Sequence, residues 1–306
     1  MKDILSTIMN EQVNSVESIQ KLWGGYGQMC RFQTSDKSYV AKVIEFPQKQ
    51  EGISHLRKVK SYEVETNWYQ KYNNEVQNAY SPKLIKTGQI EQKQYLVLED
   101  LANKSFIPKT EVSEAEVSLC LKWLAFFHAF YMNETPADLW EIGTYWHLET
   151  RPDELQAIDD LRLKEAAPLV DKRLNQAHFK TFVHGDAKLA NFLFSTERVA
   201  AVDFQYVGGG AGIKDVAYFL SSIYDSEQLA QNEKSCLNQY FSLLKEALSM
   251  YKPNINFKSV EHEYRELYLY AWCDFYRFLK GWSPDHWKVH SYSEQITQRV
   301  LSEIIK

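Results

Sequence analysis

Cysteine is scarce and scattered in this sequence of 306 residues. Its four cysteines, Cys30, Cys120, Cys236 and Cys273, form no C-x-x-C pair and have no histidine at a spacing typical of zinc sites. This excludes a disulfide framework and a structural zinc centre. We therefore expect four reduced, buried thiols.

The sequence also lacks runs of basic residues and long runs of apolar ones. The formal net charge is -5 at pH 7 and no Lys/Arg cluster is present, which argues against a nucleic-acid partner. The longest apolar-rich stretch, residues 123–132, is too short to cross a bilayer, and the N-terminus lacks the apolar core of a signal peptide. We expect no membrane segment and a cytoplasmic location, while the oligomeric state is not readable.

What the sequence does contain is an ordinary share of hydrophobic residues, 44%, in a chain long enough for one large or two modest domains. The pattern from Trp23 to about residue 101 is rich in strands with one helix, and from about residue 111 it is mainly helical. This change predicts an α+β protein with an N-terminal part, residues 1–101, and a helical C-terminal part, residues 102–306.

The most informative stretch runs from His184 to Gln205. Asp186 is followed five residues later by Asn191, and Asp203 comes at the end of the next predicted strand. A kinase catalytic loop needs an Asp to accept the proton of the substrate hydroxyl, an Asn five residues later to hold a magnesium ion, and a second metal-binding Asp. Lys188 adds a cation for the phosphate that is transferred.

A strand–turn–strand pattern surrounds these residues. Residues 181–183 read as a strand that leads into the loop, residues 192–194 as one that leaves it, and residues 195–198 as a turn. Residues 199–202 form the last strand and deliver Asp203. Alternatively, the loop is a surface turn and Asp203 a strand-end cap, but four polar positions in this order favour a phosphate site.

At these residues the chain resembles the aminoglycoside phosphotransferase and choline kinase family, including its ecdysteroid-kinase-like branch. The matching motifs are His184, Gly185 and Asp186, then Asn191, Asp203 with Phe204 and Gln205, and an Asp-x-Ala helix start at residues 215–220. The resemblance covers most of the chain and is densest over residues 181–222. It implies a bilobal protein-kinase-like fold, with a small, mostly antiparallel β N-lobe carrying one helix and a larger, mainly helical C-lobe. It also implies ATP and Mg²⁺ as cofactors.

A glycine-rich turn, residues 24–27, precedes a predicted strand in the N-terminal part. The backbone at Gly25 and Gly27 is a candidate for covering the nucleotide phosphates, because glycine lets main-chain N–H groups approach closely. The stretch departs from the kinase pattern G-x-G-x-x-G-x-V, since Cys30 and Phe32 occupy the third Gly and the Val positions. An ordinary turn between strands is the alternative.

Lys42 is a single lysine within an apolar strand pattern, residues 39–43. In a kinase such a lysine contacts the inner phosphates and is held by a glutamate of the next helix. Glu65 shares a helical face with the aromatic residues of 68–72, whereas Glu63 shares one with polar residues. A carboxylate on an aromatic face needs a cationic partner, so we expect Glu65 to pair with Lys42.

Residues 94–98 read as a buried strand that leads into a linker at residues 99–101. In a kinase-like fold this linker is the hinge, and the backbone groups of Glu99 and Leu101 are candidates for binding adenine.

Two histidines are expected to have structural roles rather than catalytic ones. We expect His128 to lie in a helical core, and His184 to orient the loop through backbone hydrogen bonds rather than transfer a proton.

The acceptor is expected to be a small molecule. Protein kinases need a long activation segment that ends in Ala-Pro-Glu, and this sequence has only a short glycine-rich link at residues 208–212, followed by Asp215 as the expected N-cap of a helix. So short and flexible a link cannot present a peptide-docking groove. An aromatic and polar loop, residues 143–152, is one candidate for lining the acceptor site.

The region 264–292 is rich in aromatic residues and offers a second candidate. Asp274 with Trp272, Trp282 and Trp287 has the composition of a site for a cationic acceptor. The alternative is that these residues form a core and that Asp274 pairs with Arg277 three positions later.

The sequence therefore predicts an ATP- and Mg²⁺-dependent phosphotransferase that moves the γ-phosphate to a hydroxyl of an amino alcohol, aminoglycoside, sugar or sterol-like molecule. A protein-kinase-like regulator and a non-catalytic nucleotide-binding module are the alternatives.

Overall fold

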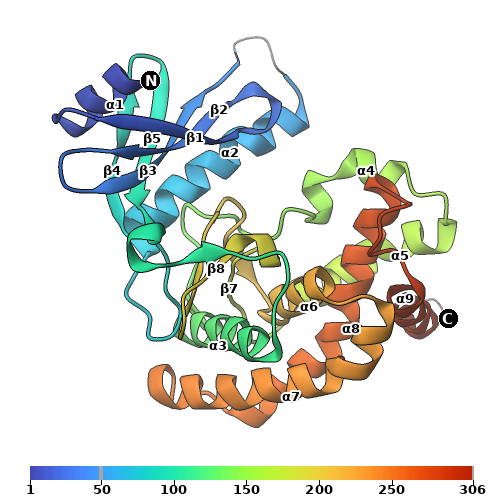
Figure 1. The fold of residues 1–306 in the computed structure, drawn as a ribbon. Helices are drawn as coiled ribbons and strands as arrows, with labels where there is room; N and C mark the ends of the chain where they lie inside the picture. Colours follow the sequence, from blue (N-terminus) through green and yellow to red (C-terminus); the bar gives the residue numbers. More distant parts are fainter. Residues whose placement is uncertain (48–50, 305–306) are drawn as a thin grey trace. The chain divides into compact units, whose positions relative to one another are not determined.

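A computed structural model describes residues 1–47 and 51–304 of the chain (Figure 1). The chain divides into two compact units. The first contains residues 1–74 and 81–107, and the second contains residues 75–80 and 108–306. The expected boundary lay near residue 101. In the structure residues 102–107 also belong to the first unit, whereas the short segment 75–80 belongs to the second.

The first unit is built on one antiparallel sheet with the order β1-β2-β3-β5-β4. Its strands are β1 (Ser15–Lys21), β2 (Gly27–Gln33), β3 (Ser38–Glu45), β4 (Leu84–Ile90) and β5 (Lys93–Glu99). Alternate residues of a strand face opposite sides. In β3, Ala41 and Val43 therefore face one side of the sheet, and Lys42 and Ile44 face the other.

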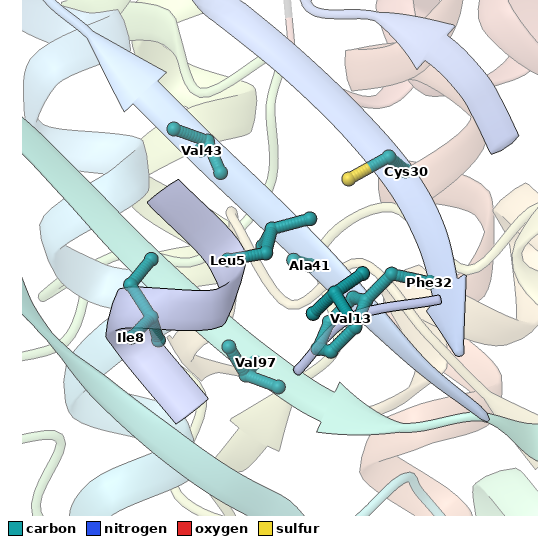
Figure 2. Packing of buried hydrophobic residues seen from close by; sticks show 8 residues of the cluster. All are labelled: Leu5, Ile8, Val13, Cys30, Phe32, Ala41, Val43 and Val97. Atoms are coloured by element: carbon teal, nitrogen blue, oxygen red, sulfur yellow. The ribbon is translucent and has the colours of Figure 1, made fainter. Parts of the chain in front are cut away.

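Each face of this sheet is covered by apolar contacts with a different helix. On one face Leu5 and Ile8 of α1 (Lys2–Met9) pack against strand residues, as Figure 2 shows. That cluster contains Leu5, Ile8, Val13, Cys30, Phe32, Ala41, Val43 and Val97. On the other face Ile44 packs with Tyr62 of α2 (Ile53–Asn67), which continues into a π-helical turn, Trp68–Tyr72. Lys42 therefore lies on the face that α2 covers. The α1 helix comes in addition to the one helix that the sequence predicts.

The second unit is mainly helical, and its strands are short. Its longer helices are α3 (Glu114–Phe130), α5 (Leu161–Asn175), α6 (Ile213–Ile223), α7 (Ser226–Tyr251), α8 (Phe257–Trp282) and α9 (Ser291–Ile304), with the short α4 (Pro152–Gln156) before α5. Helices α3 and α7 lie side by side, and α8 packs against α5, α6 and α9 (Figure 1). Capping boxes start both α3, at Ser113 and Glu116, and α7, at Asp225 and Gln228.

Two pairs of short strands hold the loop singled out by the sequence. β8 (Phe192–Phe194) and β9 (Val199–Ala201) form the predicted hairpin, closed by a hydrogen bond from Ser195 N to Arg198 O of 2.9 Å. β7 (Thr181–Val183), which leads into the loop, pairs with β10 (Gly208–Gly210). The remaining strand, β6 (Ile107–Pro108), lies where the chain passes from one unit to the other.

The glycines of β10 were expected to form a flexible link, and this expectation is wrong. Gly208–Gly210 is a buried strand. A Cβ atom added to Gly208 would lie 2.1 Å from the carbonyl oxygen of Trp140, because the segment around Trp140 runs directly alongside. The glycines thus permit close backbone packing rather than mobility.

All four cysteines are buried free thiols, as expected. Among the helices of residues 1–47 and 51–304, none is long and apolar enough to cross a bilayer.

Candidate functional site

The hairpin brings Asn191 and Asp203 to neighbouring positions in the second unit. Asn191 ends a 3₁₀ turn (Leu189–Asn191) directly before β8, and its carbonyl oxygen accepts a hydrogen bond of 2.9 Å from Val202 N, one residue before Asp203. The β8–β9 pairing fixes this register. The two predicted metal ligands therefore stand at the open end of one hairpin, as the sequence spacing predicted.

Asp186 lies beside them and is almost completely buried. Its Oδ2 accepts hydrogen bonds of 3.0 Å from Lys188 Nζ and 3.0 Å from Asn191 Nδ2. Its Oδ1 is buried and makes no hydrogen bond within 3.5 Å with any described residue, although the nearby Tyr218 hydroxyl interacts with this carboxylate. Such an orphaned buried acceptor is uncommon and costly. It is the arrangement expected of a base whose partner, a substrate hydroxyl, arrives with the substrate.

The charges of the loop influence one another. Burial raises the pKa of Asp186, the Lys188 ammonium opposes this rise, and the Asp203 carboxylate adds to it. Burial acts to lower the pKa of Lys188, but the Asp186 carboxylate outweighs burial and the net shift is upward. Lys188 is thus held in its charged form, with its side chain 39% exposed. It is a cation that can contact an incoming phosphate.

Asp203 has an unusual backbone. Its φ is +68°, in the left-handed region that residues other than glycine seldom adopt. Strain of this kind is often found at functional sites, where the surrounding structure enforces it. Here it follows the last strand of the hairpin and leaves Asp203 half-buried.

Asn191 and Asp203 suit a magnesium ion better than a transition metal. In the described part of the chain, no group of three or more His, Cys, Asp or Glu residues could hold a metal by itself. Mg²⁺ usually takes one or two oxygen ligands from the protein and completes its shell with phosphate oxygens and water. One carboxylate and one amide oxygen fit that requirement.

Asp215 anchors the loop, which is not the role expected from the sequence. It was expected to cap a helix, but Gly212 occupies the N-cap position and Asp215 is the third residue of α6. Its carboxylate turns back to the loop instead, and accepts hydrogen bonds of 2.5 Å from His184 N and 3.0 Å from Gly185 N. His128 Nε2 lies 3.2 Å from the same carboxylate. The Asp215 carboxylate therefore binds backbone N–H groups of the loop instead of those at the start of α6.

Both histidines behave as predicted. His128 is fully buried, and its Nδ1 lies 2.9 Å from the Tyr240 hydroxyl. In His184, Nδ1 accepts a hydrogen bond of 3.3 Å from Asp186 N, so Nε2 donates to the carbonyl oxygen of Val202 at 3.0 Å. Burial lowers the pKa of His184, which keeps the ring neutral. The ring thus ties the loop to the end of β9.

The loop 143–152 packs directly on the loop that carries Asp186. Tyr145 N donates a hydrogen bond of 3.1 Å to the carbonyl oxygen of Gly185. Its hydroxyl lies 3.3 Å from that of Tyr218 on α6. Burial raises the pKa of both tyrosines, and the Asp186 carboxylate raises them further. Both phenols therefore stay protonated near the Asp186 carboxylate, as hydrogen-bond donors.

In the first unit Lys42 and Glu65 form the predicted ion pair. Lys42 Nζ lies 2.7 Å and 2.9 Å from the two carboxylate oxygens of Glu65, and both side chains are buried. Glu63 is exposed, as helical periodicity predicted. The pair holds the lysine rigidly on the face of the sheet that α2 covers.

The glycine turn precedes β2 and has backbone angles that favour glycine. Gly25 and Gly27 have φ values of +78° and +123°. Gly27 is packed tightly, because an added Cβ would lie 2.0 Å from the carbonyl oxygen of Val43. At Gly25 an added Cβ would meet nothing within 4 Å. The space beside Gly25 is open, whereas Gly27 is required by the sheet itself.

The linker after β5 contains an anchor that the sequence analysis missed. Asp100 is buried and accepts hydrogen bonds of 2.7 Å from both Arg31 Nε and Ser38 Oγ. Burial acts to raise the pKa of Asp100, but these hydrogen bonds outweigh it and hold the pKa below its usual range. On either side of Asp100, Glu99 N donates to the carbonyl oxygen of Lys83, and the carbonyl oxygen of Leu101 accepts from Phe106 N. The linker is thereby fixed to the sheet.

The four residues proposed for a cationic acceptor do not form one group. Asp274 is buried, lies 2.5 Å from Arg277 and 3.9 Å from Lys214, and accepts a hydrogen bond of 2.9 Å from Trp146 Nε1. The pairing with Arg277 that the sequence left open is therefore present. Trp272 is also buried.

Trp282 and Trp287 instead lie at the surface of the second unit. They are 54% and 55% exposed and flank His286, with ring centroids 5.9 Å and 6.0 Å away. Asp274 and Trp272 belong to the interior of this unit, and Trp282 and Trp287 to its surface.

Comparison with known proteins identifies the family. The model of the phosphotransferase enzyme family matches residues 18–243, which include the Lys42–Glu65 pair and the whole catalytic loop. The chain belongs to the phosphotransferase enzyme family. This membership confirms the resemblance seen in the motifs, and it indicates a small-molecule phosphotransferase. No curated protein sequence matches the chain significantly.

Solved structures with the fold of this family are similar along nearly the whole chain. Amicoumacin kinase, in complex with AMP-PNP, Ca²⁺ and its ligand, is 12% identical, with 93% of this chain and 87% of that chain covered and a TM-score of 0.53. Spectinomycin phosphotransferase, with ADP and spectinomycin, is 10% identical, with 97% and 92% covered and a TM-score of 0.53. Choline kinase from Cryptosporidium parvum is 11% identical, with 94% and 88% covered and a TM-score of 0.52. At this identity the likeness establishes the kinase-like fold.

Proposed function

We propose that this protein is an ATP- and Mg²⁺-dependent kinase that transfers the γ-phosphate to a hydroxyl group of a small molecule. The observation that carries the proposal is the Asp186 carboxylate, with one oxygen held by Lys188 and Asn191 and the other buried without a hydrogen bond to the described residues. The nucleotides bound to amicoumacin kinase and spectinomycin phosphotransferase support the choice of ATP.

The chemistry assigned to the loop is direct transfer. The acceptor hydroxyl donates a hydrogen bond to Asp186 Oδ1, and Asp186 takes the proton as the hydroxyl oxygen forms a bond to the γ-phosphorus. The bond between the γ-phosphorus and the β–γ bridging oxygen breaks, and ADP leaves. Lys188 neutralises charge on the transferring group. Asn191 and Asp203 would hold Mg²⁺, which supplies charge neutralisation on the phosphates when bound.

Residues of the first unit are assigned to the nucleotide. Lys42, oriented by Glu65, contacts the inner phosphates, and the backbone at Gly25 covers them. Gly27 supports this turn from within the sheet. The Glu99 carbonyl oxygen and the Leu101 N–H, which the linker contacts described above do not use, are assigned to the adenine ring.

A peptide acceptor is disfavoured by the segment after Asp203. Only residues 204–212 separate Asp203 from α6, and Gly208–Gly210 within them form a buried strand. This segment therefore offers no activation loop on which a peptide docks. A non-catalytic nucleotide-binding module remains the alternative that an assay must test.

The test is an assay of the purified protein with ATP and a panel of small hydroxyl compounds, following both ADP and phosphorylated product. We expect product only when Mg²⁺ is present, and a loss of at least 100-fold in kcat for Asp203→Asn. Glu197→Gln, which removes a carboxylate from the exposed turn of the hairpin, is the matched control. Magnesium-independent turnover, or full activity of Asp203→Asn, would refute the proposal.

A further inference from the structure

Lys288 is a buried lysine that the proposed mechanism leaves unused. It lies between α8 and α9 and is only 7% exposed. Its ammonium group lies 3.3 Å from Ser221 Oγ and 4.6 Å, 5.4 Å and 5.5 Å from the ring centroids of Tyr218, Phe275 and Trp287. Three aromatic rings and one hydroxyl thus surround this charge.

No carboxylate of the described residues lies within ion-pair distance of Lys288, although the other buried cations Lys42, Lys214 and Arg277 each have one. Taking an ammonium out of water without a counter-charge is costly. Burial accordingly lowers the pKa of Lys288 to about 7, with Asp186 opposing the shift and Lys188 adding to it. The site would gain stability from an anionic partner.

The position of Lys288 connects it with the catalytic loop. Ser221, its hydrogen-bond partner, is followed on α6 by Ser222, whose Oγ accepts a hydrogen bond of 2.9 Å from Leu189 N, next to Lys188. The charge of Asp186 acts on both Lys288 and the Tyr218 ring beneath it. Lys288 therefore belongs to the surroundings of the base.

Further cations of the protein contact the aromatic cluster around Lys288. Tyr218 and Phe275 pack against Trp146, with ring centroids 4.9 Å and 5.1 Å away. On the Trp146 side lie the cations Lys214 and Arg277, with Asp274 between them. Two nitrogens of Arg277, Nε and Nη1, are buried and donate to no described residue. The rings that would attract a cationic ligand are already covered by the protein's own cations.

We propose that Lys288 binds an anionic group of the acceptor, so that the substrate is a hydroxyl compound with a negative charge, such as a hydroxy acid or sugar acid, rather than an amine. This inference rests on the proposed kinase function and narrows its acceptor class. Trp287, whose ring centroid lies 5.5 Å from the ammonium, is 55% exposed, so the aromatic cluster around Lys288 reaches the surface of the second unit on this side. An acceptor carboxylate near Lys288 would supply the missing counter-charge, and its hydroxyl would reach toward Asp186.

The experiment uses two matched sets of compounds that differ in charge: glucuronate, glucose and glucosamine, and glycolate, ethylene glycol and ethanolamine. Binding is measured by calorimetry and phosphoryl transfer by product analysis, both at pH 6.5. The variants are Lys288→Met, which keeps the volume and removes the charge, and Lys258→Met, which removes an exposed lysine of α8 as control.

We expect the wild type and the control to bind the anionic member of at least one set at least tenfold more tightly than the neutral and cationic members. Lys288→Met should lose roughly 10- to 100-fold in affinity and in kcat/KM for the anionic member, as for a lost charged hydrogen bond, and little for the neutral one. A wild-type preference for the amines, absence of binding by both anions, or unchanged anion binding by Lys288→Met would overturn the inference. Preferential phosphoryl transfer to a hydroxyl of the amino compounds would contradict only this inference. Failure of transfer from MgATP to every compound would instead count against the kinase function itself.

Discussion

At the scale of single residues, buried charges decide what each part of this molecule can do. Lys42, Glu65, Asp186, Asp215 and Lys288 are all less than a tenth exposed. Burial of a charge costs free energy unless a partner compensates it. Lys42, Glu65 and Asp215 have partners within the protein, whereas Asp186 Oδ1 and the Lys288 ammonium are left for a ligand to complete.

The effects of the Lys42–Glu65 pair on stability and on activity can be measured separately. Glu65→Gln removes the carboxylate that lies beside the buried ammonium, and we expect a loss of roughly 3 kcal/mol in the free energy of unfolding. The double variant Lys42→Met/Glu65→Leu replaces both charges by apolar groups and should recover most of that stability, while kcat/KM for ATP stays low. Urea unfolding and steady-state kinetics measure the two effects.

The exposed Glu63 of the same helix provides the control, because Glu63→Gln should change neither quantity. A double variant that retained wild-type kcat/KM would show that the pair is only structural.

The lowered pKa of Lys288 predicts that the free energy of unfolding depends on pH. This pKa is about 7 in the folded protein and ~10.4 in an unfolded chain, so above pH 7 the unfolded state binds the extra proton. The free energy of unfolding contributed by Lys288 therefore rises with pH between these values. Relative to Lys288→Met, the wild type should gain roughly 2 kcal/mol between pH 7 and 9. Chemical denaturation of both proteins across this range checks the sign, and parallel curves would contradict it.

At the scale of secondary structure elements, substitutions of Gly25 and Gly27 test whether the turn before β2 is needed for the sheet or for binding the nucleotide. Gly27→Ala combines a φ of +123° with a Cβ 2.0 Å from Val43 O, and should cost roughly 3 kcal/mol or more. Gly25→Ala has a φ of +78° but open space, and should cost only about 1 kcal/mol. If the Gly25 backbone contacts phosphates, this milder variant should still raise KM for ATP several-fold. An unchanged KM would assign the turn to the sheet alone.

Much of this element-level arrangement was predictable from local patterns. The β8–β9 hairpin, the strand β5 and the inward direction of Glu65 follow from alternation, turn residues and helical periodicity. The spacing of Asp186 and Asn191 was sufficient to place them in one loop. These features depend on neighbours within a few residues of one another.

Features that depend on distant partners were not predictable. Asp215 looks in the sequence like a helix cap, and only the packing of α6 behind the loop turns its carboxylate toward His184 and Gly185. Asp100 appears as a linker residue until Arg31 and Ser38 approach it in the folded sheet. The strand character of Gly208–Gly210 depends on β7 and on the segment around Trp140. In each case the partner is fixed by tertiary packing and leaves no local signal.

At the scale of the whole molecule, each unit contributes one of the two sets of residues that the proposed phosphotransferase needs. The first unit holds a lysine oriented by a buried glutamate, and the second holds the residues proposed as base, phosphate-binding cation and metal ligands. Membership of the phosphotransferase enzyme family accounts for both sets in one chain. The proposed transfer therefore depends on Asp186 acting as its base.

The most direct measurement is single-turnover transfer of a labelled γ-phosphate from MgATP to an acceptor hydroxyl, followed as labelled phosphorylated product, by the wild type and by Asp186→Asn. Asn keeps the shape of the side chain and removes the base, so ATP affinity and thermal stability should be retained while the transfer rate falls by roughly 100- to 10,000-fold. An Asp186→Asn variant that transfers the label at the wild-type rate would contradict the central claim.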